Sequence, residues 1–184
     1  MIKSVAVFLG SASPSEARLN FAYNFGKELA ERGFPVVFGG AEVGTMKAFA
    51  DGVIEHGGDI TGVFPKGFGG KREVAAVRKS ILMSRVTRMV EVKDMGERMS
   101  VMNKLSDCCV IIPGGYGTME ELFCYAVENE IGIHDKQAFV LNTDGYYDAL
   151  EEQIATMKRE GFLRADSDVI TFYHSIDDLF AVMK

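Results

Sequence analysis

The stretch CCVIIPGGYGTMEEL, residues 108–122, carries the clearest structural signal in this chain. It passes from an apolar run through a glycine-rich turn into a segment with helical spacing. A strand that enters a helix through such a turn is the repeating unit of parallel α/β sheets. Helices cover both faces of these sheets, so their strands are apolar without alternation. The stretch therefore predicts one strand of a parallel sheet.

Other apolar runs repeat this pattern along the chain and alternate with longer segments of helical period. Together they predict six parallel strands in a Rossmann-like, doubly wound α/β fold, with helices on both faces and a single domain over residues 1–184. The predicted strands are 5–9, 36–38, 60–64, 89–92, 108–112 and 138–141.

Helix starts and stops can be read between these runs. The first helix is expected to begin at Ser13, with Pro14 in its first position and Glu16 closing a capping box. Residues 66–86 are expected to form a loop and an irregular helix. A second helix is expected from after Gly40 to about residue 58. The remaining predicted helices cover about 94–106, 117–131, 146–159 and 176–183.

Composition and charge exclude several classes of protein. The chain is 47% hydrophobic and 25% charged, which is typical of a soluble globular protein. Its 20 basic and 26 acidic residues give a net charge of −6, which disfavours nucleic acid and acidic membranes as partners. The sequence shows no signal peptide and no apolar window of about 18 residues, so we expect a cytoplasmic protein.

Cysteine and histidine patterns point away from metal and disulfide chemistry. Cys108, Cys109 and Cys124 form no CxxC pair, and we interpret them as packing thiols in a reducing compartment. The three histidines are scattered without the spacing of metal ligands, so no metal site is predicted.

Three glycine-bearing turns each follow a predicted strand. In a parallel sheet they converge on one crevice at the carboxyl edge, where ligands bind. Their backbone N–H groups, together with a helix N-terminus, suit a phosphate. The alternative is that these glycines only make tight turns. The candidate residues are Gly10 and Ser11; Gly39, Gly40 and Gly44; and Pro113, Gly114, Gly115, Tyr116, Gly117 and Thr118.

Two charged side chains are expected at the same crevice. Glu121 either closes a capping box with Thr118 or places a carboxylate beside a sugar. Arg98 lies on the flank of a methionine stripe that includes Met95 and Met99, and its planar guanidinium suits oxyanions. The stripe itself is more typical of core than of a cofactor site.

These residues resemble the LONELY GUY family of cytokinin riboside 5′-monophosphate phosphoribohydrolases, whose members are often described as lysine decarboxylases. The stretch from Pro113 to Glu121 resembles the family signature PGGxGTxxE, and the other glycine turns fall in family order. The resemblance covers nearly the whole chain. It implies cleavage of the N-glycosidic bond of a nucleoside 5′-monophosphate, without a cofactor, by Arg98 and Glu121. It also implies that the PGGYGT turn holds the phosphate and that Met95 borders the site.

The chain departs from the family pattern at two places. The usual Met-His-x-Arg-Lys is Met95-Gly96-Glu97-Arg98-Met99 here, so one site cation is missing. Lys47 stands in the second turn, where the family has glycine, and is a candidate replacement. The alternative is that Lys47 is solvated and Met99 is core.

Two further expectations concern partners. The resemblance implies a homodimer with its sites near the interface, and residues 118–131 carry apolar side chains around much of the helix. A non-catalytic nucleotide or molybdenum cofactor carrier of related fold is the competing interpretation of the glycine turns. A pyridoxal-dependent decarboxylase is not indicated, since nothing marks a Schiff-base lysine.

Overall fold

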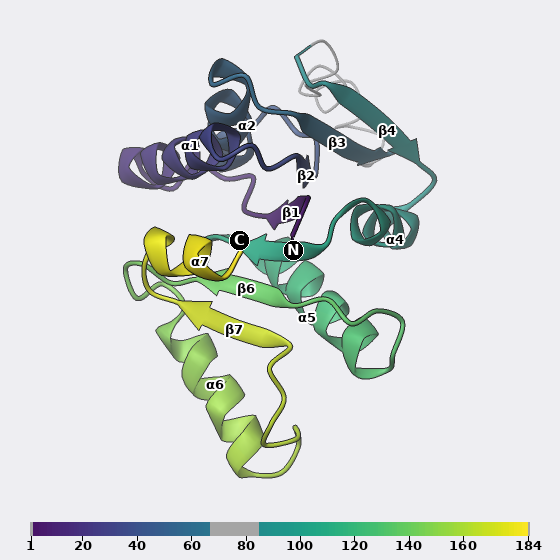
Figure 1. The fold of residues 1–184 in the computed structure, drawn as a ribbon, viewed down its shortest axis with the longest axis vertical. Helices are drawn as coiled ribbons and strands as arrows, with labels where there is room; N and C mark the ends of the chain where they lie inside the picture. Colours follow the sequence, from purple (N-terminus) through teal and green to yellow (C-terminus); the bar gives the residue numbers. More distant parts are fainter. Residues whose placement is uncertain (1, 67–84, 184) are drawn as a thin grey trace.

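Parallel pairing and strand order define the architecture. The computed structural model describes residues 2–66 and 85–183. In these residues seven parallel strands form one sheet in the order β4-β3-β2-β1-β5-β6-β7 (Figure 1). The strands are β1 (Val5–Phe8), β2 (Val36–Phe38), β3 (Ile60–Pro65), β4 (Arg88–Val92), β5 (Cys108–Ile111), β6 (Ala138–Leu141) and β7 (Ile170–Tyr173).

The strand order reverses between β1 and β5. The chain builds outward from β1 to β4, then returns to add β5, β6 and β7 on the other side of β1. Val5 pairs with Cys108 and Phe8 with Ile111, so the two strands end at the same level. The turns that follow them therefore face each other across the switch point of a doubly wound sheet, as predicted.

Helices cover both faces of the sheet (Figure 1). One face carries α1 (Glu16–Glu31), α2 (Gly44–Glu55) and α7 (Ile176–Val182), and the other carries α4 (Met95–Leu105), α5 (Tyr116–Glu130) and α6 (Asp148–Arg159). Each face has its own apolar cluster. Phe25 of α1 packs near Phe49 of α2 in the first, and Met102 and Leu122 lie in the second. Burial on both faces explains why β1, β2, β5 and β6 lack alternation.

Helices α1 and α2 touch through their backbones. A Cβ on Gly26 would lie 2.3 Å from the Phe49 carbonyl oxygen, and one on Gly52 would lie 2.0 Å from the Tyr23 carbonyl oxygen. Any larger residue at either glycine would force the two helices apart.

The expected count of six strands was wrong. β7 is the additional strand, and it pairs with β6 from Ile170 to Tyr173. The sequence carried a signal for it, because Ile170, Thr171, Phe172 and Tyr173 are β-branched or aromatic. All four residues are half-buried, as fits an edge strand covered less completely than the centre.

The predicted start of the first helix was also wrong. Ser15, rather than Ser13, caps α1 and accepts a hydrogen bond from the Arg18 N–H at 3.3 Å. Pro14 therefore lies before the helix. The loop and irregular helix expected within residues 66–86 fall mostly on 67–84, outside the described residues.

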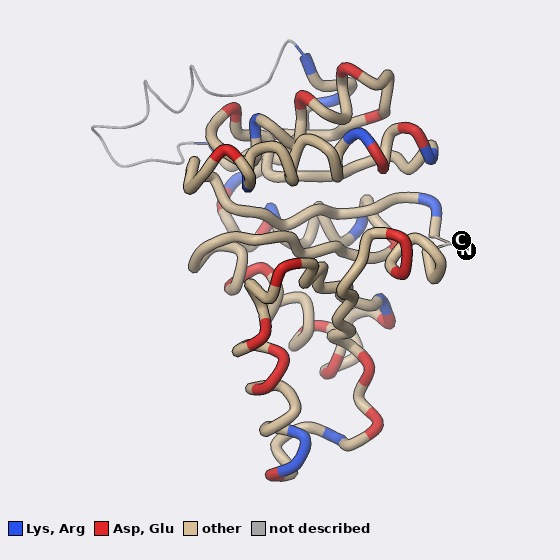
Figure 2. The backbone as a smooth tube through the Cα atoms, turned by 90° about the vertical axis from the view of Figure 1, so that its left-hand side faces the viewer, with Lys and Arg blue, Asp and Glu red and all other residues tan. Residues whose placement is uncertain are grey.

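Charges of both signs are interspersed along the backbone, as Figure 2 shows. No helix within residues 2–66 and 85–183 is both long and apolar enough to cross a membrane. In the same ranges, no group of three or more His, Cys, Asp or Glu side chains is arranged to hold a metal ion.

Candidate functional site

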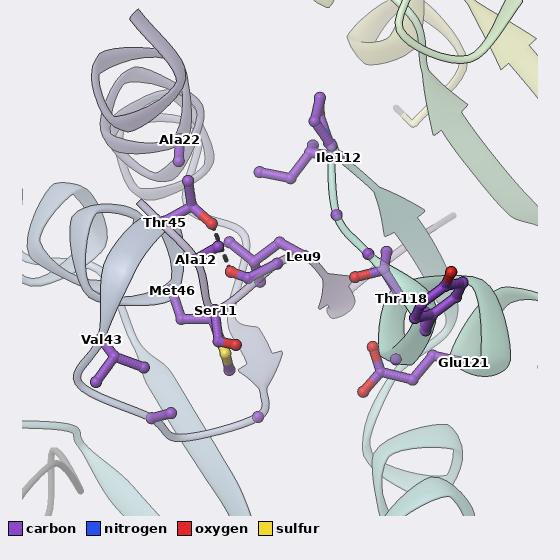
Figure 3. Close-up of a pocket in the computed structure, with 18 of the residues that line it drawn as sticks. Leu9, Ser11, Ala12, Ala22, Val43, Thr45, Met46, Ile112, Thr118 and Glu121 are labelled. Carbon is purple, nitrogen blue, oxygen red and sulfur yellow. Dashed lines mark hydrogen bonds between the residues drawn. The ribbon is translucent and has the colours of Figure 1, made fainter. Parts of the chain in front are cut away.

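A cavity of about 620 Å³ opens at the carboxyl edge of the sheet, where the strand order reverses. Figure 3 shows Thr118 and Glu121 of α5 on one wall, and Val43 and Met46, from the start of α2, on the other. The structure brings most of the predicted site residues to this cavity. Those lining it are Gly10, Ser11, Gly39, Met95, Arg98, Pro113, Gly114, Gly115, Tyr116, Gly117, Thr118 and Glu121.

The turns after β1 and β5 are in direct contact. The Gly10 N–H donates to the Pro113 carbonyl at 3.3 Å. A Cβ on Gly114 would lie 2.0 Å from the Thr118 hydroxyl oxygen and 2.8 Å from the Gly10 nitrogen. Gly114 is thus required by the close approach of two backbones. The contact fixes the floor of the cavity between the two turns.

The first turn of α5 presents free backbone donors to the cavity. Gly115 is the N-cap, and the first helical hydrogen bond runs from the Met119 N–H to the Gly115 carbonyl at 3.1 Å. Within the described residues, no side chain caps this helix start. The N–H groups of Tyr116, Gly117 and Thr118 therefore have no partner inside the helix, and this is the arrangement that binds phosphate.

Of the two interpretations of Glu121, the structure excludes the capping box with Thr118. The helix begins at Tyr116, so Thr118 already lies inside the first turn and Glu121 lies one turn further on. Both side chains are buried, with 2% and 7% of their surface exposed. Glu121 is therefore free of a capping role and lies on the cavity wall.

Arg98 and Glu121 form a buried ion pair. The distance from Arg98 Nη1 to Glu121 Oε1 is 3.1 Å, and Arg98 Nε also donates to the Val63 carbonyl at 3.3 Å. Asp94 caps α4 and so places Arg98 in its first turn, facing α5. A Cβ on Gly39 would lie 2.1 Å from Arg98 Nη2, so the glycine after β2 makes room for the guanidinium.

The Glu121 carboxyl group has a raised pKa. Burial raises the pKa to about 7, although Arg98 opposes the shift, and Glu120 adds to it. The group is therefore close to half ionised at neutral pH. A carboxyl group of this kind in a cavity can stabilise positive charge or exchange a proton with water.

Gly40 and Gly44 shape the second turn without lining the cavity. Both have positive φ, at 75° and 51°, where glycine is favoured. Gly40 packs on Gly62, and a Cβ on Gly44 would lie 2.2 Å from the Ser11 carbonyl oxygen. Next to it, Thr45 donates its hydroxyl to the Gly10 carbonyl and its N–H to the Ala12 carbonyl at 2.9 Å. The second turn is thereby fastened to the first.

Lys47 is not brought to the cavity. It lies one turn into α2, where its Nζ pairs with Asp51 Oδ2 at 2.5 Å, and 44% of its side chain is exposed. Met99 has 7% of its surface exposed and packs in the second apolar cluster. The structure thus favours the alternative interpretation, in which Lys47 is a solvated residue and Met99 belongs to the core.

Sequence reasoning missed the apolar wall and two residues at the cavity mouth. The wall includes Phe21, Val43 and Met46. In the sequence these apolar residues look like ordinary core residues of a helix. Arg18 and Tyr146 also line the cavity, and their partial exposure places them at its mouth. The paired tyrosines at 146 and 147 are the only local signal for the second, while Arg18 resembles any surface residue of a helix.

The described part of the cavity offers no group that would hold pyridoxal phosphate covalently. Its Schiff base requires a lysine amine, and no lysine lines the cavity in the described part of the chain. The charged lining residues there are Arg18, Arg98 and Glu121.

Solved structures similar to this one share its fold. A molybdenum cofactor binding protein from Rippkaea orientalis superimposes with a TM-score of 0.70 at 18% identity, covering 100% of this chain and 96% of that chain. The molybdenum cofactor carrier protein from Chlamydomonas reinhardtii gives 0.67 at 20% identity, covering 98% and 95%. At such identities the likeness concerns the fold alone.

Sequence relatives are considerably more similar. A family model described as "Possible lysine decarboxylase" matches residues 46–184. A probable cytokinin riboside 5′-monophosphate phosphoribohydrolase of Oryza sativa subsp. japonica is 39% identical over 88% of this chain and 70% of its own length. One from Arabidopsis thaliana is 38% identical over 88% of this chain and 77% of its own length. The chain therefore belongs to the LONELY GUY family, as its glycine turns and the residues of its cavity had indicated.

Proposed function

We propose that this protein hydrolyses the N-glycosidic bond of nucleoside 5′-monophosphates with an adenine-type base, including cytokinin riboside 5′-monophosphates. The products are the free base and ribose 5-phosphate. The observation that carries the proposal is the buried Arg98–Glu121 pair, which lies in the same cavity as the uncapped start of α5. The names of the relatives support the same reaction.

Each part of the cavity has a role in this reaction. The N–H groups at the start of α5 bind the phosphate, and the apolar wall receives the base and any apolar substituent on it. As the bond from C1′ to the base nitrogen breaks, positive charge develops on the sugar. The ionised Glu121 carboxylate stabilises that charge and orients a water molecule. The base nitrogen leaves with the electron pair of the broken bond. The water oxygen bonds to C1′ and keeps one proton as the new hydroxyl group, and the other proton of the water goes to the base.

Arg98 has a positioning role beside Glu121. Its guanidinium is buried and held by the Val63 carbonyl, so the Glu121 carboxylate is presented to the cavity in one orientation. Its positive charge also keeps a fraction of Glu121 ionised despite burial.

Base release from phosphorylated and unphosphorylated substrates tests the proposal. The purified protein is incubated with AMP, N6-isopentenyl-AMP and adenosine, and free base is measured by chromatography. We expect both monophosphates to be hydrolysed, and adenosine at least about 100-fold less efficiently because it lacks the phosphate contacts. Comparable kinetics on adenosine and AMP would contradict the proposal. Binding without any turnover would favour the carrier alternative.

We also propose a homodimer formed through α5. Val127 on this helix is 56% exposed, and Ile131 and Ile133, at and just after its end, are 67% and 65% exposed. An apolar row of this kind is typical of a surface that another subunit covers. Light scattering should give about twice the chain mass of 20.2 kDa, and Val127→Glu together with Ile131→Glu should halve it. A wild-type mass near that of one chain would contradict the dimer.

The remaining partner proposals follow from charge and chemistry. The expected ligand is a small nucleotide, and the net charge of −6 disfavours nucleic acid and acidic membranes. Cys108 and Cys109 are buried free thiols, which fits the cytoplasm as a reducing compartment.

A further inference from the structure

Arg18 is a cation of the cavity that the mechanism above does not use. It lies in the first turn of α1, and 24% of its side chain is exposed. In the described part of the chain, Arg18 and Arg98 are the basic residues that line the cavity. They differ in how much of their charge is already balanced by a buried partner.

Arg98 is already engaged by buried protein groups. Its Nη1 pairs with Glu121, and its Nε donates to the Val63 carbonyl. A phosphate monoester brings about 1.5 to 2 negative charges at neutral pH. The backbone donors of α5 supply only partial positive charge, so the group would be better balanced by a second cation at the mouth.

One aromatic ring connects Arg18 to the glycine turn after β5. Its guanidinium carbon lies 4.9 Å from the centre of the Tyr146 ring. The hydroxyl group of the same tyrosine donates to the Gly114 carbonyl at 2.7 Å. The ring holds the planar guanidinium by cation–π stacking. The N–H groups at the edge of the guanidinium stay available for an oxyanion.

The partner of Arg18 is one that a ligand can replace. Arg18 Nη1 lies 2.5 Å from Asp144 Oδ2, and 47% of the Asp144 side chain is exposed. Exposed ion pairs contribute little to stability, because water screens them. A phosphate group at the start of α5 can therefore draw Arg18 away from Asp144, or share it, at small cost.

We propose that Arg18 binds the phosphate group of the nucleotide, stacked on Tyr146 and held in place by Asp144 until the ligand arrives. The inference rests on the proposed function for the identity of the ligand. Arg18 thus sets the preference for phosphorylated over unphosphorylated substrates, and Asp144 weakens phosphate binding by competing for the same guanidinium.

Two substitutions distinguish this role from a structural one. Arg18→Gln should raise the Kd of AMP and of ribose 5-phosphate, measured by calorimetry, by about 10- to 100-fold. It should lower kcat/KM for AMP by a similar factor and change that for adenosine less than about twofold. Asp144→Asn should act in the opposite direction and tighten ribose 5-phosphate binding by about two- to fivefold, because the competing charge is gone.

A salt bridge that only fastens the loop before α6 to α1 predicts a different result. Both substitutions would then remove the same contact, weaken ligand binding in the same direction and lower Tm by similar amounts. That outcome would overturn the inference, and so would an unchanged Kd in Arg18→Gln.

Two control variants complete the design. Arg18→Lys keeps the charge and loses the planar fork, so it should recover part of the lost affinity. Arg159→Gln removes an exposed arginine of α6 that is not among the residues lining the cavity, and it should bind ribose 5-phosphate as the wild type does. Calorimetry measures binding without turnover. A wild type that binds the nucleotide but releases no base would contradict the proposed reaction, and the effect of Arg18→Gln on binding could still be measured.

Discussion

Polar side chains join α4 to α5 at both ends, and the two junctions face different surroundings. The open junction, Arg98 and Glu121, lies at the helix starts on the cavity wall. The closed junction consists of Asn103 and Glu128 near the helix ends and Lys136 of the loop after α5, none of which lines the cavity. The Asn103 amide donates to Glu128 there, and Lys136 Nζ donates to the Asn103 carbonyl and, at 2.7 Å, to the Ser106 carbonyl.

The difference shows how one pair of helices divides its tasks. In the closed junction Asn103 and Glu128 join the two helices directly, and a lysine satisfies carbonyls at the end of α4. In the open junction burial leaves the Glu121 carboxyl group with a pKa of about 7, so its charge remains available to a ligand. The same kinds of residue thus stabilise the fold at one end and, at the other, form the pair to which we assign the reaction.

The largest expected effect is that of Glu121→Gln. The amide keeps the shape and an acceptor for Arg98 but removes the negative charge that faces the sugar, so kcat should fall by about 100-fold or more. The variant should still fold, because the amide oxygen still accepts from Arg98 and the cost of burying a carboxylate is removed. Base release and thermal melting measure the two quantities.

The same substitution in the closed junction is the matched control. Glu128→Gln changes one carboxylate of the same helix to an amide and should leave kcat within about twofold of the wild type. If Glu121→Gln instead melts much earlier and retains its specific activity, the open junction is structural and the comparison fails.

Activity should also depend on pH through Glu121. The ionised form stabilises the charge on the sugar, so kcat/KM should fall as the pH drops through about 7. A single group with that pKa predicts a loss of about 30-fold between pH 8 and pH 5.5. Binding of ribose 5-phosphate over the same range accounts for titration of the phosphate itself. A flat profile would show that Glu121 does not act as a carboxylate.

Stability should respond to pH in the opposite sense. The pKa of Glu121 is higher in the folded than in the unfolded chain, so protonation favours the folded state. This contribution is fully present below a pH of about 4.5 and is lost as the pH rises through about 7. The Tm difference between wild type and Glu121→Gln should therefore change across this window and stay constant above it.

Lys136→Met tests the closed junction from its basic side. The substitution leaves two carbonyl oxygens at the end of α4 without their donor, so we expect a loss of about 1 to 2 kcal/mol in unfolding free energy. Denaturant titration measures it. The kcat of the folded variant should match that of the wild type. A large loss of kcat without a loss of stability would show that the two junctions are coupled.

The smallest effect is expected for Lys47→Ala. Lys47 belongs to neither junction, and its exposed pair with Asp51 contributes little to stability. The KM for AMP should change less than about twofold. Met99→Lys, by contrast, buries a charge in the apolar cluster and should destabilise the fold instead of improving binding. A raised KM in Lys47→Ala would restore Lys47 as a site cation.

Sequence reasoning found the parts of the fold that are determined locally. Buried strands and glycine turns leave a pattern within five to ten residues, as in the stretch around Gly114. Arg98 and Glu121 could be placed at one edge because each lies near the carboxyl end of a strand. Their mutual contact became visible only when the packing of α4 against α5 was known.

The wrong predictions concern features that depend on tertiary contacts. Ser13 and Ser15 are both good caps, and only the structure shows that Ser15 is the one used. Lys47 and Arg18 are both basic residues near the start of a helix, yet the former faces Asp51 and the latter faces the cavity. A sequence pattern does not specify which way such a side chain turns, because the choice depends on partners distant in the chain.

The glycine contact between α1 and α2 has a mechanical consequence. At Gly26 and Gly52 the two helices touch backbone to backbone, with no side chain between them at these points. The turns that precede these helices are fastened to each other through Thr45. The helices and turns on this side of the cavity should therefore move as one rigid unit. When a ligand binds, amide hydrogen exchange should slow together in the turns after β1 and β2.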